Sequence, residues 1–129
     1  MAKTRWLDRR IAHPGPYLSL VLSQKELDKS IKSFGVGSVV FPCNGAKVYI
    51  LDNDKGERCC VVSLSIPAQS MKLVEIAGLL VHEAVHVWQE YVILLGEHSP
   101  GTEQEAYGIQ SISQELLAEY LRRTKNANR

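Results

Sequence analysis

A small α+β domain is the fold class that the sequence predicts. Residues 71–95, and the segment that starts at Thr102, carry apolar residues at helical spacing. The middle of the chain, by contrast, is rich in Val, Ile and Tyr between turn residues, a pattern typical of strands. The chain has 129 residues, of which 45% are hydrophobic and 22% charged. These values suit one ordinary globular domain, so we expect residues 1–129 to form a single domain around one core.

The first part of the chain is expected to contain one helix. Residues 1–16 look irregular or partly helical, and Tyr17 to Leu22 form an apolar run that fits a strand or a helix. Ser23 and Glu26 have the spacing of a capping box, in which each side chain satisfies a backbone N–H group of the first turn. Gly35 is a suitable C-terminal stop. We therefore predict a helix that begins after Ser23 and ends near Gly35.

The middle of the chain predicts a small antiparallel sheet. Its expected strands are Ser38 to Phe41, Ala46 to Leu51 and Arg58 to Ile66. The turn residues Asn44-Gly45 and the run 52–56 lie between them.

Two long helices are expected after the sheet. Ser70 is a candidate cap for a helix over Met71 to Leu95, and Gly96 follows its end. Thr102, with Glu105 three residues later, matches a second capping box. The helix that follows carries a broad apolar stripe, formed by Ala106, Ile109, Ile112, Leu116, Leu117 and Tyr120.

The motif His82-Glu83-Ala84-Val85-His86 lies inside the first of these long helices. Side chains four residues apart lie on one face of a helix, so His82 and His86 can direct their imidazoles at a single point. Neutral imidazole is a preferred ligand of Zn²⁺. Glu83 is rotated by about 100° from His82, so it can reach a metal-bound water without ligating the metal. The motif therefore predicts a zinc site with Glu83 as general base.

A catalytic zinc site needs a third protein ligand. The extended motif with a third histidine is absent, since Gln89 and Val92 occupy its Gly and His positions. Glu103, at the start of the last helix, is the preferred candidate. Glu105 is the alternative, because it lies nearer the apolar stripe, although a capping box would use it. His98, in the preceding loop, is a weaker candidate.

Other residues near the motif are expected to support the site or the packing of its helices. Glu103, Ala106 and Tyr107 share a helix face, and we expect Tyr107 to hydrogen-bond a zinc-bound histidine or the reacting oxygen. The small Ala106, together with Gly78, would let the two helices approach closely. Trp88 is expected to anchor the core. Gln89 fits either a hydrogen bond to His86 or a position facing solvent.

Residues Val81 to Gln89, followed by Glu103-x-Glu105-Ala106-Tyr107, resemble short phage- and prophage-encoded HExxH metallopeptidases and, more broadly, the gluzincins. The resemblance implies a minimal zincin-like domain, in which a small sheet packs on the HExxH helix and a C-terminal helix bears the third ligand. It implies that Glu103 is this ligand, and that a strand within Arg58 to Ile66 pairs with an extended substrate. Some branches have Asp where this chain has Tyr107.

The expected function is hydrolysis of peptide bonds by a zinc-activated water, with catalytic Glu83 and Tyr107 and the metal ligands His82, His86 and Glu103. The substrate would be a peptide or protein. The alternative is a zinc-stabilised module without catalysis that takes part in phage assembly or host interaction.

Charge and composition argue against other function classes. The net charge of +1 gives no electrostatic basis for binding nucleic acid, and no apolar run is long enough for a membrane span. No secretory signal is visible. The cysteines Cys43, Cys59 and Cys60 make a poor disulfide framework and are expected to be buried small residues. We therefore expect a cytoplasmic protein, located in the host cytoplasm if a phage encodes it.

Overall fold

A computed structural model describes residues 17–35, 37–96 and 101–124 of the chain. The expectations for residues 1–16 and for His98 lie outside these residues. The elements, in chain order, are β1 (Tyr17–Val21), α1 (Gln24–Phe34), β2 (Ala46–Asp52), β3 (Arg58–Leu64), the short 3₁₀ helix η1 (Ala68–Ser70), α2 (Leu73–Leu95) and α3 (Thr102–Thr124). The predicted α+β class is confirmed.

The sheet is mixed rather than antiparallel, which corrects the prediction. Its strand order is β1-β3-β2, with β2 antiparallel and β1 parallel to the central β3. The apolar run that begins at Tyr17 is therefore a strand. Because β3 has a neighbour on each side, it has no free edge for a substrate, and the substrate strand expected within Arg58 to Ile66 is wrong. The edge strand near the histidines is β2.

The predicted strand from Ser38 to Phe41 does not form. The Gln24 side chain donates to the carbonyl of Val39 over 3.0 Å and accepts from the N–H of Phe41 over 2.8 Å. The Tyr49 hydroxyl donates to the carbonyl of Val40. Side chains thus form hydrogen bonds with the backbone N–H and C=O groups that a strand would use to pair with a neighbouring strand.

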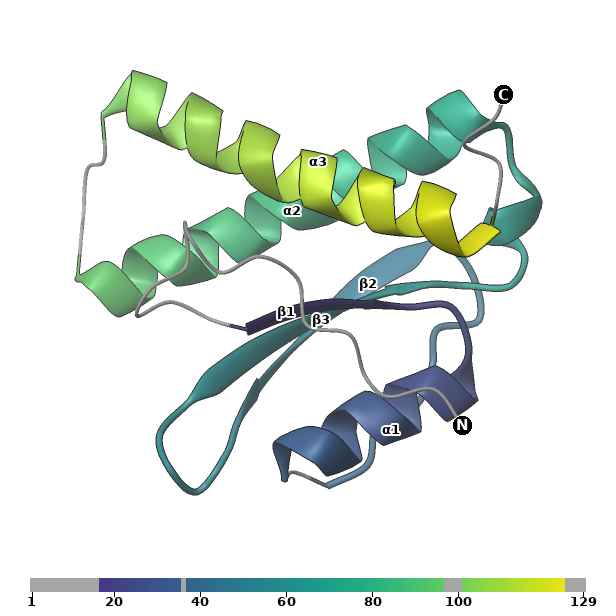
Figure 1. Cartoon of the computed structure of the whole chain (residues 1–129), viewed down its shortest axis with the longest axis horizontal. Helices are drawn as coiled ribbons and strands as arrows, with labels where there is room; N and C mark the ends of the chain where they lie inside the picture. The colour runs from purple at the N-terminus through teal and green to yellow at the C-terminus, as the bar shows by residue number, and fades with distance from the viewer. Residues whose placement is uncertain (1–16, 36, 97–100, 125–129) are drawn as a thin grey trace.

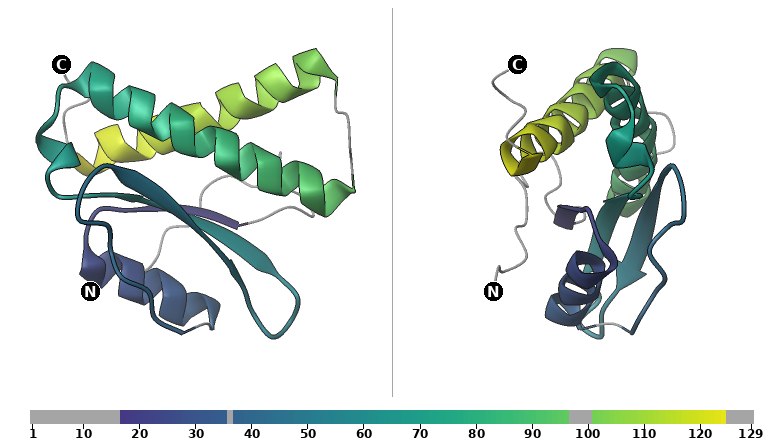
Figure 2. Two further views of the ribbon diagram at one scale, coloured as in Figure 1. Left: turned by 180° about the vertical axis from the view of Figure 1, so that it is seen from behind. Right: turned by 90° about the vertical axis from the view of Figure 1, so that its right-hand side faces the viewer.

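The sheet is the middle of three layers. In Figures 1 and 2, α2 and α3 cross above one face of the sheet and α1 covers the other. Helix α2 lies over β2, and α3 lies over β1. The buried strand β3 alternates between the two faces, so Cys60, Val62 and Leu64 pack under α2 and α3 while Cys59 and Val61 pack against α1. Cys43 is exposed, so its predicted burial is wrong.

The ends of α1 follow the predicted capping chemistry, whereas the starts of α2 and α3 differ from it. Ser23 caps α1 by accepting from the N–H of Glu26, and Gly35 ends it at a φ of 84°. Ser70 does not cap α2, because it belongs to η1. The N-terminus of α2 is instead Lys72, whose backbone N–H donates to the Glu75 carboxylate over 3.1 Å. Thr102 is the first residue of α3, and the N–H of Glu105 donates to the carbonyl of Gly101.

Helices α2 and α3 are in close contact where Gly108 meets Trp88. A Cβ atom added to Gly108 would lie 2.3 Å from a ring carbon of Trp88, whereas one added to Gly78 would have no neighbour within 4 Å. Trp88 is buried, as predicted. Ala106 and Gly78 are exposed, so the prediction that they form the close contact is wrong.

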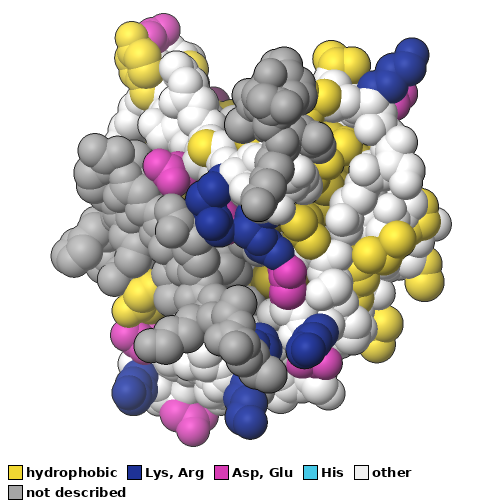
Figure 3. Space-filling model, turned by 45° about the vertical axis from the view of Figure 1, so that its right-hand side comes forward, with side chains coloured by type: hydrophobic (Ala, Val, Ile, Leu, Met, Phe, Trp, Pro, Cys, Tyr) yellow, Lys and Arg dark blue, Asp and Glu magenta, His cyan; other side chains and the backbone are white. Residues whose placement is uncertain are grey.

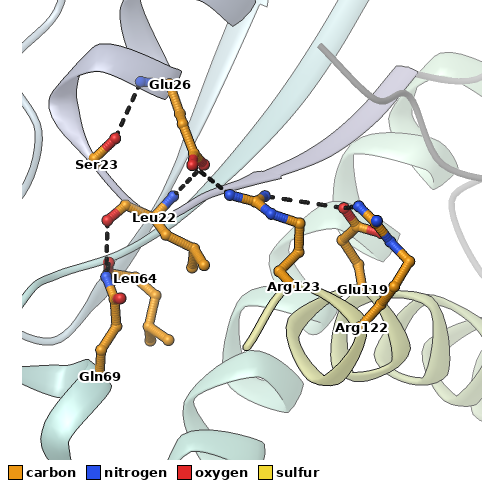
Figure 4. A network of polar contacts seen from close by, with 8 residues as sticks. All are labelled: Leu22, Ser23, Glu26, Leu64, Gln69, Glu119, Arg122 and Arg123. Carbon is orange, nitrogen blue, oxygen red and sulfur yellow. Dashed lines mark hydrogen bonds and ion pairs between the residues drawn. The ribbon is translucent and has the colours of Figure 1, made fainter. Parts of the chain in front are cut away.

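A polar network ties the end of α3 to α1 (Figure 4). Arg123 forms an ion pair with Glu26 and lies 3.9 Å from the carboxylate of Glu119, which is buried. Arg122 pairs with Glu119 over 2.7 Å. Glu26 also accepts from the N–H of Leu22, at the end of β1. This network joins the outer helical layers across the end of the sheet.

Charged side chains of both signs lie on the surface. On the face that Figure 3 shows, Lys and Arg side chains lie next to Asp and Glu side chains. Among the described residues, none of the helices is sufficiently long and apolar to cross a membrane.

Candidate metal centre

The two histidines of the motif lie side by side on α2. Their ring centroids are 5.1 Å apart, and the ring planes are inclined at 73°. The side chain of His82 is 68% exposed, and His86 is exposed too. One helical turn separates them, so both imidazoles open on the same surface, as the spacing predicts.

Glu83 lies beneath the histidines and is only 5% exposed. Its Oε2 atom is 4.0 Å from Nε2 of His82. Burial raises the pKa of Glu83, while the charges of His82 and His86 and a hydrogen bond from the backbone of Val48 act in the opposite direction. The protein therefore holds a carboxyl group of increased basicity directly beside two imidazoles, which is the property a general base needs.

Glu83 and Val48 line the same cleft, and the backbone of Val48 interacts with the Glu83 carboxylate. Glu83 therefore lies at the edge of β2 that pairs with no strand of the described residues. The carbonyl of Gly45, just before the strand, accepts from Ser65, on the β3 side. Alternate residues of an antiparallel strand direct their backbone groups to opposite sides. Ala46, Val48 and Ile50 therefore direct their N–H and C=O groups away from β3, toward the histidines.

A shallow cleft of about 360 Å³ lies between α2 and this edge. It is lined by Ala46, Lys47, Val48 and Ile50 of β2, and by His82, Glu83, His86, Gln89 and Glu90 of α2. The site is thus a strand edge on one side and the HExxH helix on the other.

An ion-pair chain fixes one end of the cleft. Arg58, the first residue of β3, donates to Glu90 over 2.7 Å and to Asp52 over 2.7 Å and 3.1 Å. Its hydrogen bonds lower the pKa of Asp52. These ion pairs therefore join β2, β3 and α2 where the cleft ends.

Gln89 contacts His86 directly. Its Oε1 atom lies 3.1 Å from Nδ1 of the His86 ring. The sequence left open whether Gln89 would bond to His86 or face solvent. The structure contains the hydrogen bond, and the Gln89 side chain is also exposed.

The structure does not bring the predicted third ligand to the histidines. Glu103 and Glu105 are exposed in the first turn of α3, and Tyr107 is 65% exposed. Figure 1 shows this turn at the far end of the helix pair, away from the crossing of α2 and α3. Among residues 17–35, 37–96 and 101–124, no group of three His, Cys, Asp or Glu side chains is placed to hold one metal ion.

Comparison of the chain with family models, with curated proteins and with solved structures found no match. The chemistry of the site must therefore be judged from its own residues. Two imidazoles and a nearby carboxylate fit a zinc ion as two ligands and a general base. A third protein ligand is still required, and the described residues do not supply it.

Two parts of the site could not be found by reading along the sequence. The first is the edge of β2, and the second is the ion pair between Arg58 and Glu90. Both depend on which strand lies at the edge under α2. The only sequence signal was the helical position of Glu90, four residues after His86, which places it on the same helix face.

Proposed function

We propose that this chain is a zinc-dependent metallopeptidase with a minimal zincin-like fold. The observation that carries the proposal is that His82, His86 and the buried Glu83 meet in one cleft at the free edge of β2. In this proposal His82 and His86 hold the metal, and Glu83 is the catalytic base.

The chain's own residues supply the proton transfers. A bound zinc ion would supply a Lewis acid for the scissile carbonyl and lower the pKa of water to about 7. Glu83 takes a proton from the attacking water and delivers it to the leaving nitrogen. Its burial supports this role because a carboxyl group of raised pKa accepts a proton more readily.

The substrate is proposed to be an extended peptide segment. The backbone groups of Ala46 and Ile50, and the carbonyl of Val48, can pair with the main chain of such a segment at the edge of β2, while the N–H of Val48 faces Glu83. That pairing would place a peptide bond between the strand edge and the two histidines. It favours flexible polypeptide over a small molecule, because the contacts are main-chain hydrogen bonds.

The test measures zinc and peptide cleavage in the same preparations. We expect about one zinc per chain by elemental analysis, and cleavage of unstructured peptides detected by mass spectrometry. Glu83→Gln should retain zinc but cleave about 10²–10⁴-fold more slowly, the usual contribution of a general base. Asp54→Asn, an exposed turn carboxylate, is the matched control and should behave as wild type. Wild-type protein without zinc would contradict the proposal.

Glu103, Glu105 and His98 are the candidates that the sequence offers for the third ligand, and in this structure Glu103 and Glu105 form no metal-holding group with the histidines. Glu103→Gln, Glu105→Gln and His98→Ala separate them by zinc affinity. Residues that only orient ligands cost about 10–100-fold in metal affinity, so the variant that loses more than about 100-fold identifies the ligand. Tyr107→Phe tests the proposed catalytic role of Tyr107 in the cleavage assay.

A non-catalytic zinc-stabilised module for phage assembly or host interaction is the second candidate. The observation behind it is that, among the described residues, no third protein ligand joins the two histidines, as a catalytic zinc site requires. Stoichiometric zinc without cleavage of any peptide, in wild type and Glu83→Gln alike, would support this candidate.

A further inference from the structure

We propose that Gln89 is a positioning residue that fixes the tautomer of His86, so that the Nε2 lone pair of His86 is the one available in the cleft. The tautomer itself is a property of the metal-free protein. Its consequence for metal binding rests on the proposed function.

The assignment follows from the atoms in contact. Oε1 of Gln89 faces Nδ1 of His86 at 3.1 Å. An amide oxygen only accepts hydrogen bonds, so this orientation of the Gln89 amide assigns the hydrogen to Nδ1 of His86. In a neutral imidazole the other nitrogen, Nε2, then has the lone pair.

The two histidines differ in this respect. Gln89 follows His86 by three residues, and residues at this spacing are neighbours on a helix surface. The residue at the same spacing from His82 is Val85, whose side chain has no acceptor. Nε2 of His82 instead faces the Glu83 carboxylate at 4.0 Å. Helix α2 therefore orients only one ring of the pair through a side chain at this spacing.

Tautomer and orientation affect metal binding because a metal ligand must present a lone pair without first moving its proton. A hydrogen bond from the other ring nitrogen fixes this state and increases the basicity of the ligand. Removing such a partner typically lowers metal affinity by 10–100-fold. The contact between Gln89 and His86 is exposed, so we expect a loss near the lower limit, about 10-fold.

The first experiment reads the tautomer directly. The ¹⁵N shifts of the His86 ring would be recorded by NMR in chelator-treated protein at about pH 9, where imidazole is neutral. We expect the Nδ1–H tautomer to dominate in wild type and in Gln89→Glu, which retains an acceptor oxygen. In Gln89→Leu the proton should be distributed over both nitrogens. Gln110→Leu, an exposed glutamine of α3, is the control and should match wild type.

The second experiment measures zinc affinity by competition with a chromophoric chelator. Gln89→Leu should bind about 10-fold more weakly, while Gln89→Glu and Gln110→Leu should bind at least as well as wild type. Unfolding of the metal-free variants should be unchanged, which separates positioning from folding.

An equal tautomer distribution in wild type and Gln89→Leu would overturn the inference, whatever the zinc affinity. Equal zinc affinity of the two proteins would also overturn it. Wild-type protein that shows the Nδ1–H tautomer but binds no zinc would contradict the proposed function while supporting the assignment of Gln89.

Discussion

Glu83 is a buried carboxyl group beside two histidines, and its burial raises its pKa. Under the proposed function it would act as the base when a metal is bound. A group of this kind is retained at a cost to the metal-free fold, because an ionised carboxylate loses hydration when it is buried. The neighbouring Gln89 is exposed, so its contact with His86 contributes little to the fold.

Glu83→Gln is expected to stabilise the metal-free protein at neutral pH. The folded protein binds the Glu83 proton more tightly than the unfolded chain, since the folded pKa is raised above the ordinary value of 4.5. The free energy of unfolding of wild type therefore decreases as the pH rises from that value through the raised pKa. The gain from Glu83→Gln should be present at pH 7 and absent below the ordinary pKa. Urea unfolding in the presence of a chelator measures it.

The control for this prediction is Asp54→Asn, which should not change stability in this way. A variant Glu83→Gln that is less stable than wild type at neutral pH would contradict it.

At the scale of elements, the crossing of α2 and α3 depends on one glycine. Gly108 lies against Trp88 with no space for a side chain, while Gly78 faces open space one turn before His82. Since α2 carries the histidines and the first turn of α3 carries Glu103, this contact sets how the two helices lie relative to each other. The predicted contact between Ala106 and Gly78 would have set a different crossing point.

Gly108→Ala should destabilise the protein by about 1–3 kcal/mol, because its Cβ would overlap the Trp88 ring. Gly78→Ala is the matched control in the interior of a helix without neighbours, and it should stabilise by about 0.5–1 kcal/mol. Thermal unfolding of both variants measures the two effects. The opposite order of melting temperatures would show that the helices do not cross at Gly108.

At the scale of the whole molecule, the three layers are held by two cores and by the polar network at one end. The core under α2 and α3 and the core under α1 meet at the sheet, since β3 contributes to both. The ion pair between Arg123 and Glu26 joins the outer layers directly. The last turn of α3 is thereby attached to α1, although 97 residues separate the two side chains in the sequence.

A double-mutant cycle of Arg123→Met and Glu26→Gln measures this connection. We expect a coupling free energy of about 1 kcal/mol at low salt, because both side chains are partly exposed. The coupling should decrease as the ionic strength rises. A coupling of zero at low salt would show that the layers are held by apolar packing alone.

Local sequence patterns predicted the helices and the placement of His82 and His86 on one helix face. The capping residues Ser23 and Gly35 set the ends of α1, since a cap satisfies backbone groups within its own turn. The spacing of His82 and His86 placed both rings on one surface, because helix geometry alone determines it. The burial of Trp88 followed from its size.

The arrangement of the sheet was decided by the tertiary structure. Strand pairing joins residues distant in sequence, and an apolar pattern does not say which strand pairs with which. The pattern therefore could not place β1 parallel to β3, or leave β2 at the edge beside α2. The apolar pattern also could not show that the Gln24 side chain forms hydrogen bonds with the backbone of Val39 and Phe41, where a strand was expected.

The sequence by itself thus determined that the imidazoles of His82 and His86 and the carboxylate of Glu83 lie within two successive turns of one helix, since that depends only on local backbone geometry. Only the tertiary structure decided that the carboxylate of Glu83 is buried beside Val48 of β2, and that Glu103 and Glu105 form no metal-holding group with the histidines. Both are consequences of packing between distant segments, which is determined by the fit of whole surfaces and not by any local pattern.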